Sequence, residues 1–224
     1  PFPEGRTMNH LPAQVALELW VLRPFARQFV MLLGLAVLFV SFHDAGPAMA
    51  VVMAALTGSY GFAITESARL ETLFATLPST RRDVVVARYL VITGILLTAG
   101  GVGVVVDAIK AAVVGQPWSP GGSLAVVAVS FAVAALVIAI QFPFFFRLGY
   151  LRARFLTFVT IGVVGAVIAG LVVQASNSGA SSAWLEAIAR IPAAGFTAGG
   201  LLLGFGFLAA PTSLSARLYS PKDL

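Results

Sequence analysis

Six apolar stretches, each long enough to cross a lipid bilayer, run along this chain of 224 residues. A helix of about 20 apolar residues spans the hydrocarbon core, so each stretch is predicted to be a transmembrane helix. Hydrophobic residues make up 59% of the chain, more than a water-soluble core of this size encloses. We predict an all-α, polytopic membrane protein with six spans near 28–45, 47–65, 87–106, 123–146, 155–173 and 192–213.

The positive charge of the connecting loops alternates from one side of these stretches to the other. All but two of the 14 basic residues lie before the first stretch, after the last, or in and beside the loops that follow the second and fourth. The two exceptions are Lys110 and Arg190. Cytoplasmic loops carry an excess of Lys and Arg, so both termini are predicted to be cytoplasmic.

The spans leave no room for a second folded domain. The longest hydrophilic stretch, around 66–86, is too short to hold a core of its own. We therefore predict one transmembrane domain over residues 1–224. It is divided into an interfacial N-terminal segment, a six-helix membrane domain and a cytoplasmic tail, over 1–27, 28–213 and 214–224.

Residues 9–23 are predicted to form a short helix before the first span. Leu11, Val15, Leu19 and Leu22 form one apolar stripe, with Gln14 and Glu18 at its edge. Such a helix lies in the membrane interface, with Trp20 at the depth of the headgroups. The alternative is that it extends the first span. Pro24 favours a break between the two, because proline removes a helix hydrogen bond.

Ionisable residues are missing from the middle of every predicted span. Asp44, Arg88 and Asp107 lie at span ends, and Gln141 is the clearest deep polar side chain. Ion-coupled transporters use buried carboxylates or histidines to carry the coupling ion, so this class is not favoured.

Catalytic and metal-binding patterns are also missing. The chain has no cysteine, and its two histidines, His10 and His43, lie apart from any nucleophile or second metal ligand. No Gly-Lys pair occurs, which excludes an ATP-binding P-loop. We expect no enzyme activity, no bound cofactor and no metal in this chain, and we expect its energy to come from a partner.

The hydrophilic segment between the second and third spans contains a predicted amphipathic helix. Its apolar face combines positions i, i+3, i+4 and i+7, its flanks are charged, and a proline ends it before two arginines begin the next helix. The residues in question are Glu66, Leu70, Glu71, Leu73, Phe74, Leu77, Pro78, Arg81 and Arg82. This helix either docks into a partner protein or lies on the bilayer. The two arginines contact either acidic residues of the partner or lipid phosphates.

Two further patterns concern helix packing and the membrane surface. Phe142, Phe144, Phe145 and Phe146, at the end of the fourth span, are predicted to form an aromatic belt at the cytoplasmic interface. The last span contains small residues at a spacing that lets helix backbones approach closely. They are Gly195, Gly199, Gly200 and Gly204, which serve either packing within the chain or a dimer interface.

Three stretches of this sequence resemble the ABC-2 type transporter permeases. The first, ETLFATLPSTRRDVVVARYL, is similar to the family's Ser-Leu-Pro-x-Ser-Arg signature, with Thr76 and Thr80 in place of the two serines. The second, PFFFRLGYLRAR, is similar to the family's loop after the fourth span. The third, SLSARLYSPKDL, is similar to its C-terminal pattern. Together they cover about a fifth of the chain.

This resemblance implies the membrane half of a bacterial ABC exporter in the cytoplasmic membrane. Two permease subunits, identical or paralogous, would sit on two copies of a separate ATP-binding subunit that carries ATP and Mg. The coupling helix, about Glu71–Pro78, would insert into a groove on that subunit. The substrates implied are hydrophobic or amphipathic peptides, antibiotics or lipids. The excess of Lys and Arg is explained by membrane topology, so we expect no nucleic-acid partner.

Two other hypotheses compete with the exporter. A stand-alone membrane interaction or immunity protein would bind no ATPase through its 66–86 segment. An intramembrane enzyme would depend on a polar residue such as Gln141, His43 or Asp44.

Overall fold

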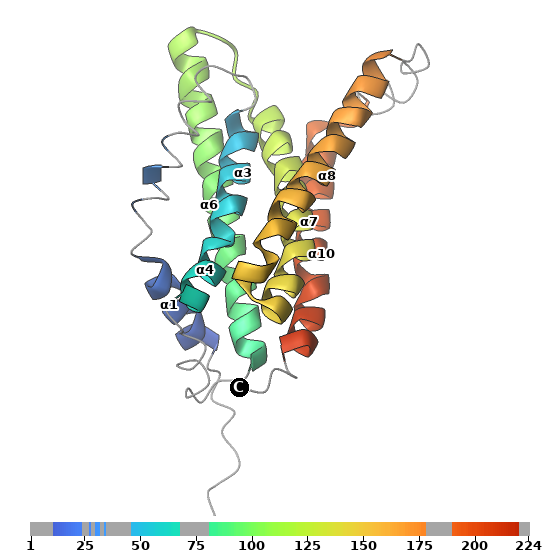
Figure 1. Cartoon of the computed structure of the whole chain (residues 1–224). Coiled ribbons are helices and arrows are strands. Elements are labelled where there is room, and N and C mark those ends of the chain that lie inside the picture. The colour runs from blue at the N-terminus through green and yellow to red at the C-terminus, as the bar shows by residue number, and fades with distance from the viewer. Residues whose placement is uncertain are drawn as a thin grey trace, which may run out of the picture.

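The computed structural model describes residues 11–23, 27, 30, 31, 34, 46–67, 81–177 and 190–219. All regular elements in these ranges are α-helices, as predicted. They are α1 (Leu11–Leu22), α3 (Gly46–Gly58), α4 (Tyr60–Ser67), α6 (Arg81–Val114), α7 (Pro120–Leu148), α8 (Tyr150–Asn177) and α10 (Ala193–Tyr219) (Figure 1).

Four of these helices are long and apolar enough to cross a membrane. The stretches that qualify are Arg82–Val114, Pro120–Leu148, Tyr150–Val167 and Ala193–Thr212. They contain or overlap the last four predicted spans. The first predicted span, 28–45, lies almost entirely outside the described residues.

The second predicted span, 47–65, forms two helices and not one. α3 ends at Gly58, and α4 begins at Tyr60 after a turn at Ser59. The Ser59 side chain donates a hydrogen bond of 2.8 Å to the carbonyl oxygen of Leu56, which provides a polar partner at this break. The two helices follow one another along the bundle (Figure 1).

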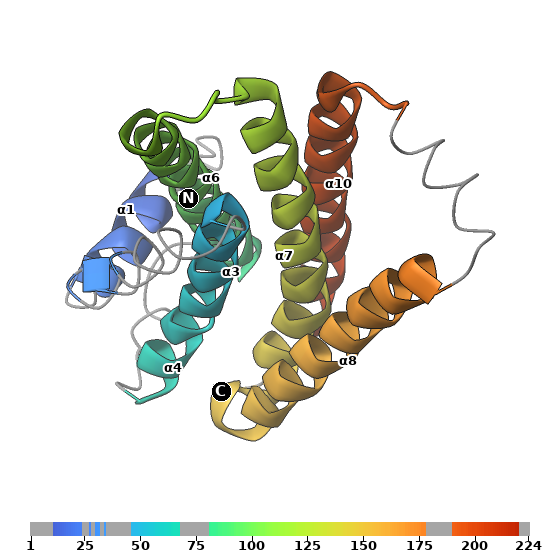
Figure 2. The same ribbon diagram turned by 90° about the horizontal axis from the view of Figure 1, so that it is seen from above.

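The core lies where α3, α6, α7 and α10 meet. α7 packs against α10 along most of its length, and α3 lies against α6 and α7. The most deeply buried large side chains include Phe131, Ile138 and Phe142 of α7 and Leu96 of α6. α1 packs against α6 and α4 at one side of this bundle (Figures 1 and 2).

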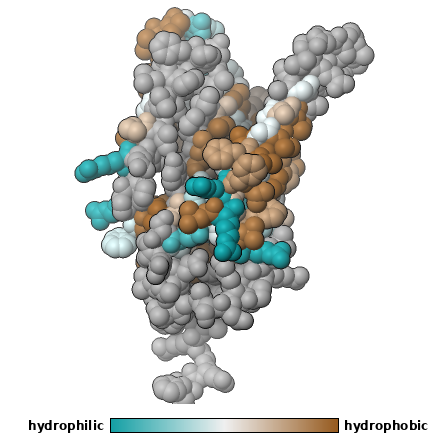
Figure 3. Space-filling model, viewed as in Figure 1, coloured by the Kyte–Doolittle hydropathy of each residue, from teal (hydrophilic) through white to brown (hydrophobic). Residues whose placement is uncertain are grey.

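α8 is the least enclosed of the long helices. Only 6% of its stretch Tyr150–Val167 is buried, against 39% of the corresponding windows in α6 and α7. Its main neighbours are α7 and α4, and its C-terminal half leans away from the bundle in both views (Figures 1 and 2). Hydrophobic side chains cover much of its visible surface (Figure 3), as expected of a helix that faces lipid.

The ends of several helices meet at the lower end of the bundle in Figure 1. There lie α1, the first turn of α6, the ends of α4, α7 and α10, and the start of α8. We call this the basic end, because it carries Arg82, Arg147, Arg152 and Arg154. Lys110 lies near the far end of α6, and Arg190 just precedes α10.

Candidate functional site

A buried ion pair joins α1 to α6 at the basic end. Nη2 and Nε of Arg88 donate hydrogen bonds of 2.7 and 3.1 Å to one carboxylate oxygen of Glu18. Nη2 also donates to the Thr65 hydroxyl of α4 at 3.0 Å, and that hydroxyl donates to the Gly61 carbonyl oxygen at 2.8 Å. One guanidinium therefore holds three helices together.

The surroundings explain why these charges are buried. An isolated charge in an apolar interior is costly, and a close opposite charge with further hydrogen bonds offsets that cost. The Arg88 guanidinium also lies 4.4 Å from the ring centroid of Phe62 and 5.9 Å from that of Phe146, within the range of cation–π attraction.

This arrangement corrects the prediction for the N-terminal helix. Gln14 and Glu18, expected at the edge of the apolar stripe, form the buried face together with Val21. Leu19 and Trp20 point outward, and Trp20 is 68% exposed. The prediction went wrong because almost the whole helix is apolar, so its hydrophobic pattern does not identify the face that meets the protein.

Aromatic rings surround the ion pair. The Phe62 centroid lies 4.9 Å from those of Phe142 and Phe146 and 5.2 Å from that of Phe145. Tyr89 packs against Phe142 at 5.1 Å. The predicted aromatic belt is therefore wrong for all but Phe144, since the other three rings of α7 are buried in the core. We call Arg88 and the rings of Phe62, Tyr89, Phe142, Phe145 and Phe146 the aromatic cluster.

The last helix joins the same cluster. The Tyr89 and Ser215 hydroxyls lie 3.1 Å apart and share a hydrogen bond between α6 and α10. The tail was predicted to begin at residue 214, but α10 continues to Tyr219 and Ser215 is fully buried. Ser215, the second residue after the predicted end of the last span, is thus part of the packed bundle.

Glu66 lies beside the loop between α7 and α8. Its Oε2 accepts a hydrogen bond of 2.9 Å from the backbone N–H of Leu151, in the first turn of α8. Gly149 separates the two helices with φ 79°, a conformation that favours glycine. A Cβ atom at this glycine would lie 3.1 to 3.3 Å from the Glu66 carboxylate.

The other predicted coupling residues are only partly described. Arg81 begins α6, as predicted, and the Arg82 side chain is exposed at the basic end. The remaining ones lie outside the described residues, namely Leu70, Glu71, Leu73, Phe74, Leu77 and Pro78. The described helices α4 and α6 flank this segment on its two sides.

The predicted packing glycines of α10 divide into two pairs. A Cβ at Gly200 would lie 2.6 Å from backbone atoms of Ala128, and one at Gly204 would lie 2.3 Å from the Phe131 ring, so both let α10 approach α7. A Cβ at Gly199 would meet nothing within 4 Å, and one at Gly195 would meet only Ile191 and Pro192 of its own chain segment.

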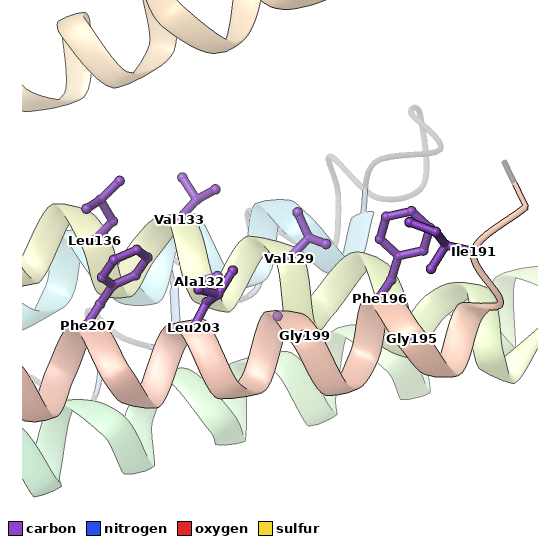
Figure 4. Close-up of a pocket in the computed structure, with 11 residues that line it drawn as sticks. Val129, Ala132, Val133, Leu136, Ile191, Gly195, Phe196, Gly199, Leu203 and Phe207 are labelled. Carbon is purple, nitrogen blue, oxygen red and sulfur yellow. The ribbon is translucent and has the colours of Figure 1, made fainter. Parts of the chain in front are cut away.

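Gly195, Gly199 and Gly200 line an apolar groove between α7 and α10. Its volume is about 400 Å³, and its walls include Val129 and Val133 of α7 and Leu203 of α10 (Figure 4). In the close-up the groove faces the helix drawn in the colour of α8. Such a surface suits a hydrocarbon chain or another apolar helix.

Metal chemistry has no support in the described part of the chain. No group of three or more His, Cys, Asp or Glu side chains there lies close enough to hold a metal ion. Gln141 is buried on α7, whereas His43 and Asp44 lie outside the described residues.

Sequence reasoning missed Glu18, Phe62 and Thr65 as partners of Arg88. One signal was present, because Glu18 and Arg88 are the sole charged residues within the apolar runs 11–22 and 84–106. Charges in such runs are rarely left unpaired, so each predicts an opposite charge nearby. Their mutual pairing follows only from the packing of α1 on α6.

One known protein family matches nearly the whole chain. The family described as ABC-2 family transporter protein matches residues 17–220. No curated protein and no solved structure matches the chain.

Proposed function

The chain is a multi-pass membrane protein of the ABC-2 transporter family, and we propose that it is the permease subunit of an ATP-driven exporter. Two permease subunits, identical or paralogous, work with two copies of a separate ABC-type ATP-binding subunit. ATP and Mg bind to that partner, because this sequence contains no P-loop.

The observation that carries the proposal is the convergence of three distant stretches at the basic end. Tyr89 follows the 66–86 segment, Phe142 and Phe145 precede the α7–α8 loop, and Ser215 belongs to the C-terminal stretch. All lie in or against the aromatic cluster. The segment between α4 and α6 is thus flanked on both sides by helices that are anchored in one packed core.

Such anchoring is what a coupling element needs. A segment that receives a push from an ATPase transmits it to the spans only if its ends are joined to rigid elements. α4 ends at Ser67, beyond the residues that contact Arg88, and α6 begins at Arg81. We assign the docking contact to the segment between α4 and α6, residues 68–80, which we call the coupling segment, with Phe74 and Leu77 on its predicted apolar face.

The charge distribution supports the orientation. We propose that the basic end faces the cytoplasm of a bacterium, with six spans and both termini on that side. Arg147, Arg152 and Arg154 then lie at the same membrane surface as the coupling segment.

The substrate is proposed to be hydrophobic or amphipathic. The groove between α7 and α10 has apolar walls, and described charges are confined to the helix ends or to the pair of Glu18 with Arg88. Such surfaces accommodate the apolar part of a peptide, an antibiotic or a lipid better than a highly charged solute.

The test is co-purification of the tagged chain from its native host in a mild detergent, followed by mass spectrometry. We expect a stoichiometric P-loop ATPase with the wild type, and its loss in the double variant Phe74→Asp with Leu77→Asp. The two substitutions would place carboxylates in an apolar docking contact, which would weaken the binding free energy by several kcal/mol.

A matched control also introduces two aspartates, at the opposite end of α6. Val113→Asp with Val114→Asp alters two exposed residues there, so the ATPase should still co-purify. A wild-type preparation without any ATPase would refute the exporter and favour a stand-alone membrane protein. Unchanged co-purification of the Phe74, Leu77 variant would refute the docking assignment alone.

A further inference from the structure

We propose that Glu66 is a positioning residue that links the coupling segment to α8, and not a contact with the ATPase. Its carboxylate holds the first turn of α8 and thereby sets the tilt of that helix away from the groove between α7 and α10. The inference rests on the proposed function only in so far as an ATPase moves the coupling segment.

The local geometry carries the first step. The first backbone N–H groups of a helix have no partner within the helix, and a carboxylate there forms a charge-assisted hydrogen bond and interacts favourably with the helix dipole. Glu66 Oε2 occupies this position at 2.9 Å from the Leu151 nitrogen. The contact comes from another helix, α4, 85 residues away in the sequence.

Gly149 supplies a pivot beside this contact. Its N–H donates to the Phe145 carbonyl oxygen at 3.0 Å and ends α7, and α8 begins at the next residue. Its positive φ and the closeness of the Glu66 carboxylate leave little space for a side chain. α8 therefore departs from α7 at one residue, held at that point by Glu66.

The rest of α8 resists reorientation only weakly. Within the stretch Tyr150–Val167, Ala153 is fully buried and Thr160 is 7% exposed, whereas most of the other residues are exposed. Phe155 and Phe158, exposed at 70% and 73%, face away from the protein. A helix with so few contacts takes its direction largely from its anchored end.

The position of Glu66 in the chain completes the argument. It is the penultimate residue of α4, immediately before the segment assigned to the ATPase contact. A displacement of that segment moves the carboxylate and hence the first turn of α8. The helix in the colour of α8 stands apart from the groove on the side to which Val133 points, so a change in its tilt changes its distance from the groove (Figure 4).

The absence of cysteine permits a direct test. Two exposed residues, Val163 of α8 and Leu202 of α10, are replaced by cysteine and spin-labelled. The distribution of distances between the two labels is measured by double electron–electron resonance in nanodiscs. Val163 lies about 20 Å along α8 from its start, so a change in tilt of about 20° moves it by roughly 7 Å.

We expect Glu66→Ala to shift the mean Val163–Leu202 distance by several ångströms or to broaden its distribution. Glu66→Gln keeps an acceptor for the Leu151 N–H and should restore the wild-type distribution. A reference pair on α6 and α10, at Leu97 and Leu202, should not change. Identical distributions for wild type and Glu66→Ala would overturn the proposal.

The same variant separates this inference from the proposed function. We expect Glu66→Ala to co-purify with the ATPase as the wild type does, while the ATP-dependent change in the Val163–Leu202 distance is lost. Loss of the ATPase from Glu66→Ala would overturn the proposal and return Glu66 to the docking surface. The distance measurement on the permease alone needs no ATPase, so it remains decisive if the exporter assignment fails.

Discussion

Removing the Glu18 carboxylate is the most direct test of the buried site. Glu18→Ala leaves the Arg88 guanidinium without its opposite charge, in a place where the two side chains are only 3% and 8% exposed. Thr65 remains a hydrogen-bond partner and Phe62 an aromatic one, but neither carries a compensating charge.

The expected magnitude follows from the burial of both partners. Breaking a buried ion pair by removing one side costs about 3–5 kcal/mol, because the remaining charge stays unpaired. That corresponds to a shift of roughly 100-fold or more in the unfolding equilibrium. Glu18→Gln keeps an oxygen acceptor and should cost less, about 1–3 kcal/mol.

Replacing both partners separates two contributions to the free energy of unfolding: the net contribution of the ion pair, and the cost of leaving one charge buried without its partner. The double variant Glu18→Leu with Arg88→Met leaves no buried charge, and apolar replacements of this kind cost little or even stabilise. We therefore expect the double variant to be more stable than Glu18→Ala.

The assay is unfolding of the purified protein in mixed micelles with increasing SDS, followed by circular dichroism and tryptophan fluorescence. Arg82→Ala, which removes an exposed charge from the same helix, is the control and should lie within about 0.5 kcal/mol of wild type. If Glu18→Ala matched this control, the pair would not be buried as described and the reasoning would be refuted.

Two further comparisons test packing in the same assay. Gly200→Ala should destabilise the protein by about 1–3 kcal/mol, because its Cβ would meet the Ala128 backbone, whereas Gly199→Ala should be neutral or slightly stabilising. Equal effects would refute the assignment of Gly200, and not Gly199, to close helix packing. Phe62→Ala should cost about 3–5 kcal/mol through the cavity it leaves among three rings, and Phe144→Ala, on the exposed face, about 0.5 kcal/mol. A small effect of the Phe62 change would argue against the aromatic cluster as the centre of packing at this end.

Helix content and several boundaries were predictable from local patterns. The last four predicted spans lie within or overlap α6, α7, α8 and α10, and α6 begins at Arg81 as its charged first turn indicated. A backbone in lipid must satisfy its hydrogen bonds within the segment, so a long apolar run has helix as its main solution. The break at Ser59 was not predicted, although Gly58 and Ser59 form a Gly-Ser pair of the kind at which helices kink.

The inward and outward faces were not predictable in the same way. Phe142, Phe145 and Phe146 suit a membrane interface and a protein core equally well by residue type. Hydropathy therefore did not distinguish the buried rings from the exposed Phe144. The same ambiguity applies to α1, where the polar residues are the buried ones and Trp20 faces outward.

By itself, then, the sequence determined an all-helical membrane protein, its apolar helices and its family, because span length, hydropathy and short motifs are local properties of the chain. Only the tertiary structure decided that Glu18 meets Arg88 across 70 residues and that Glu66 reaches Leu151 across 85. In a bilayer, lipid and protein interior are similarly apolar, so the choice of face depends on close packing and polar pairing between helices, and these exist only once the helices have assembled.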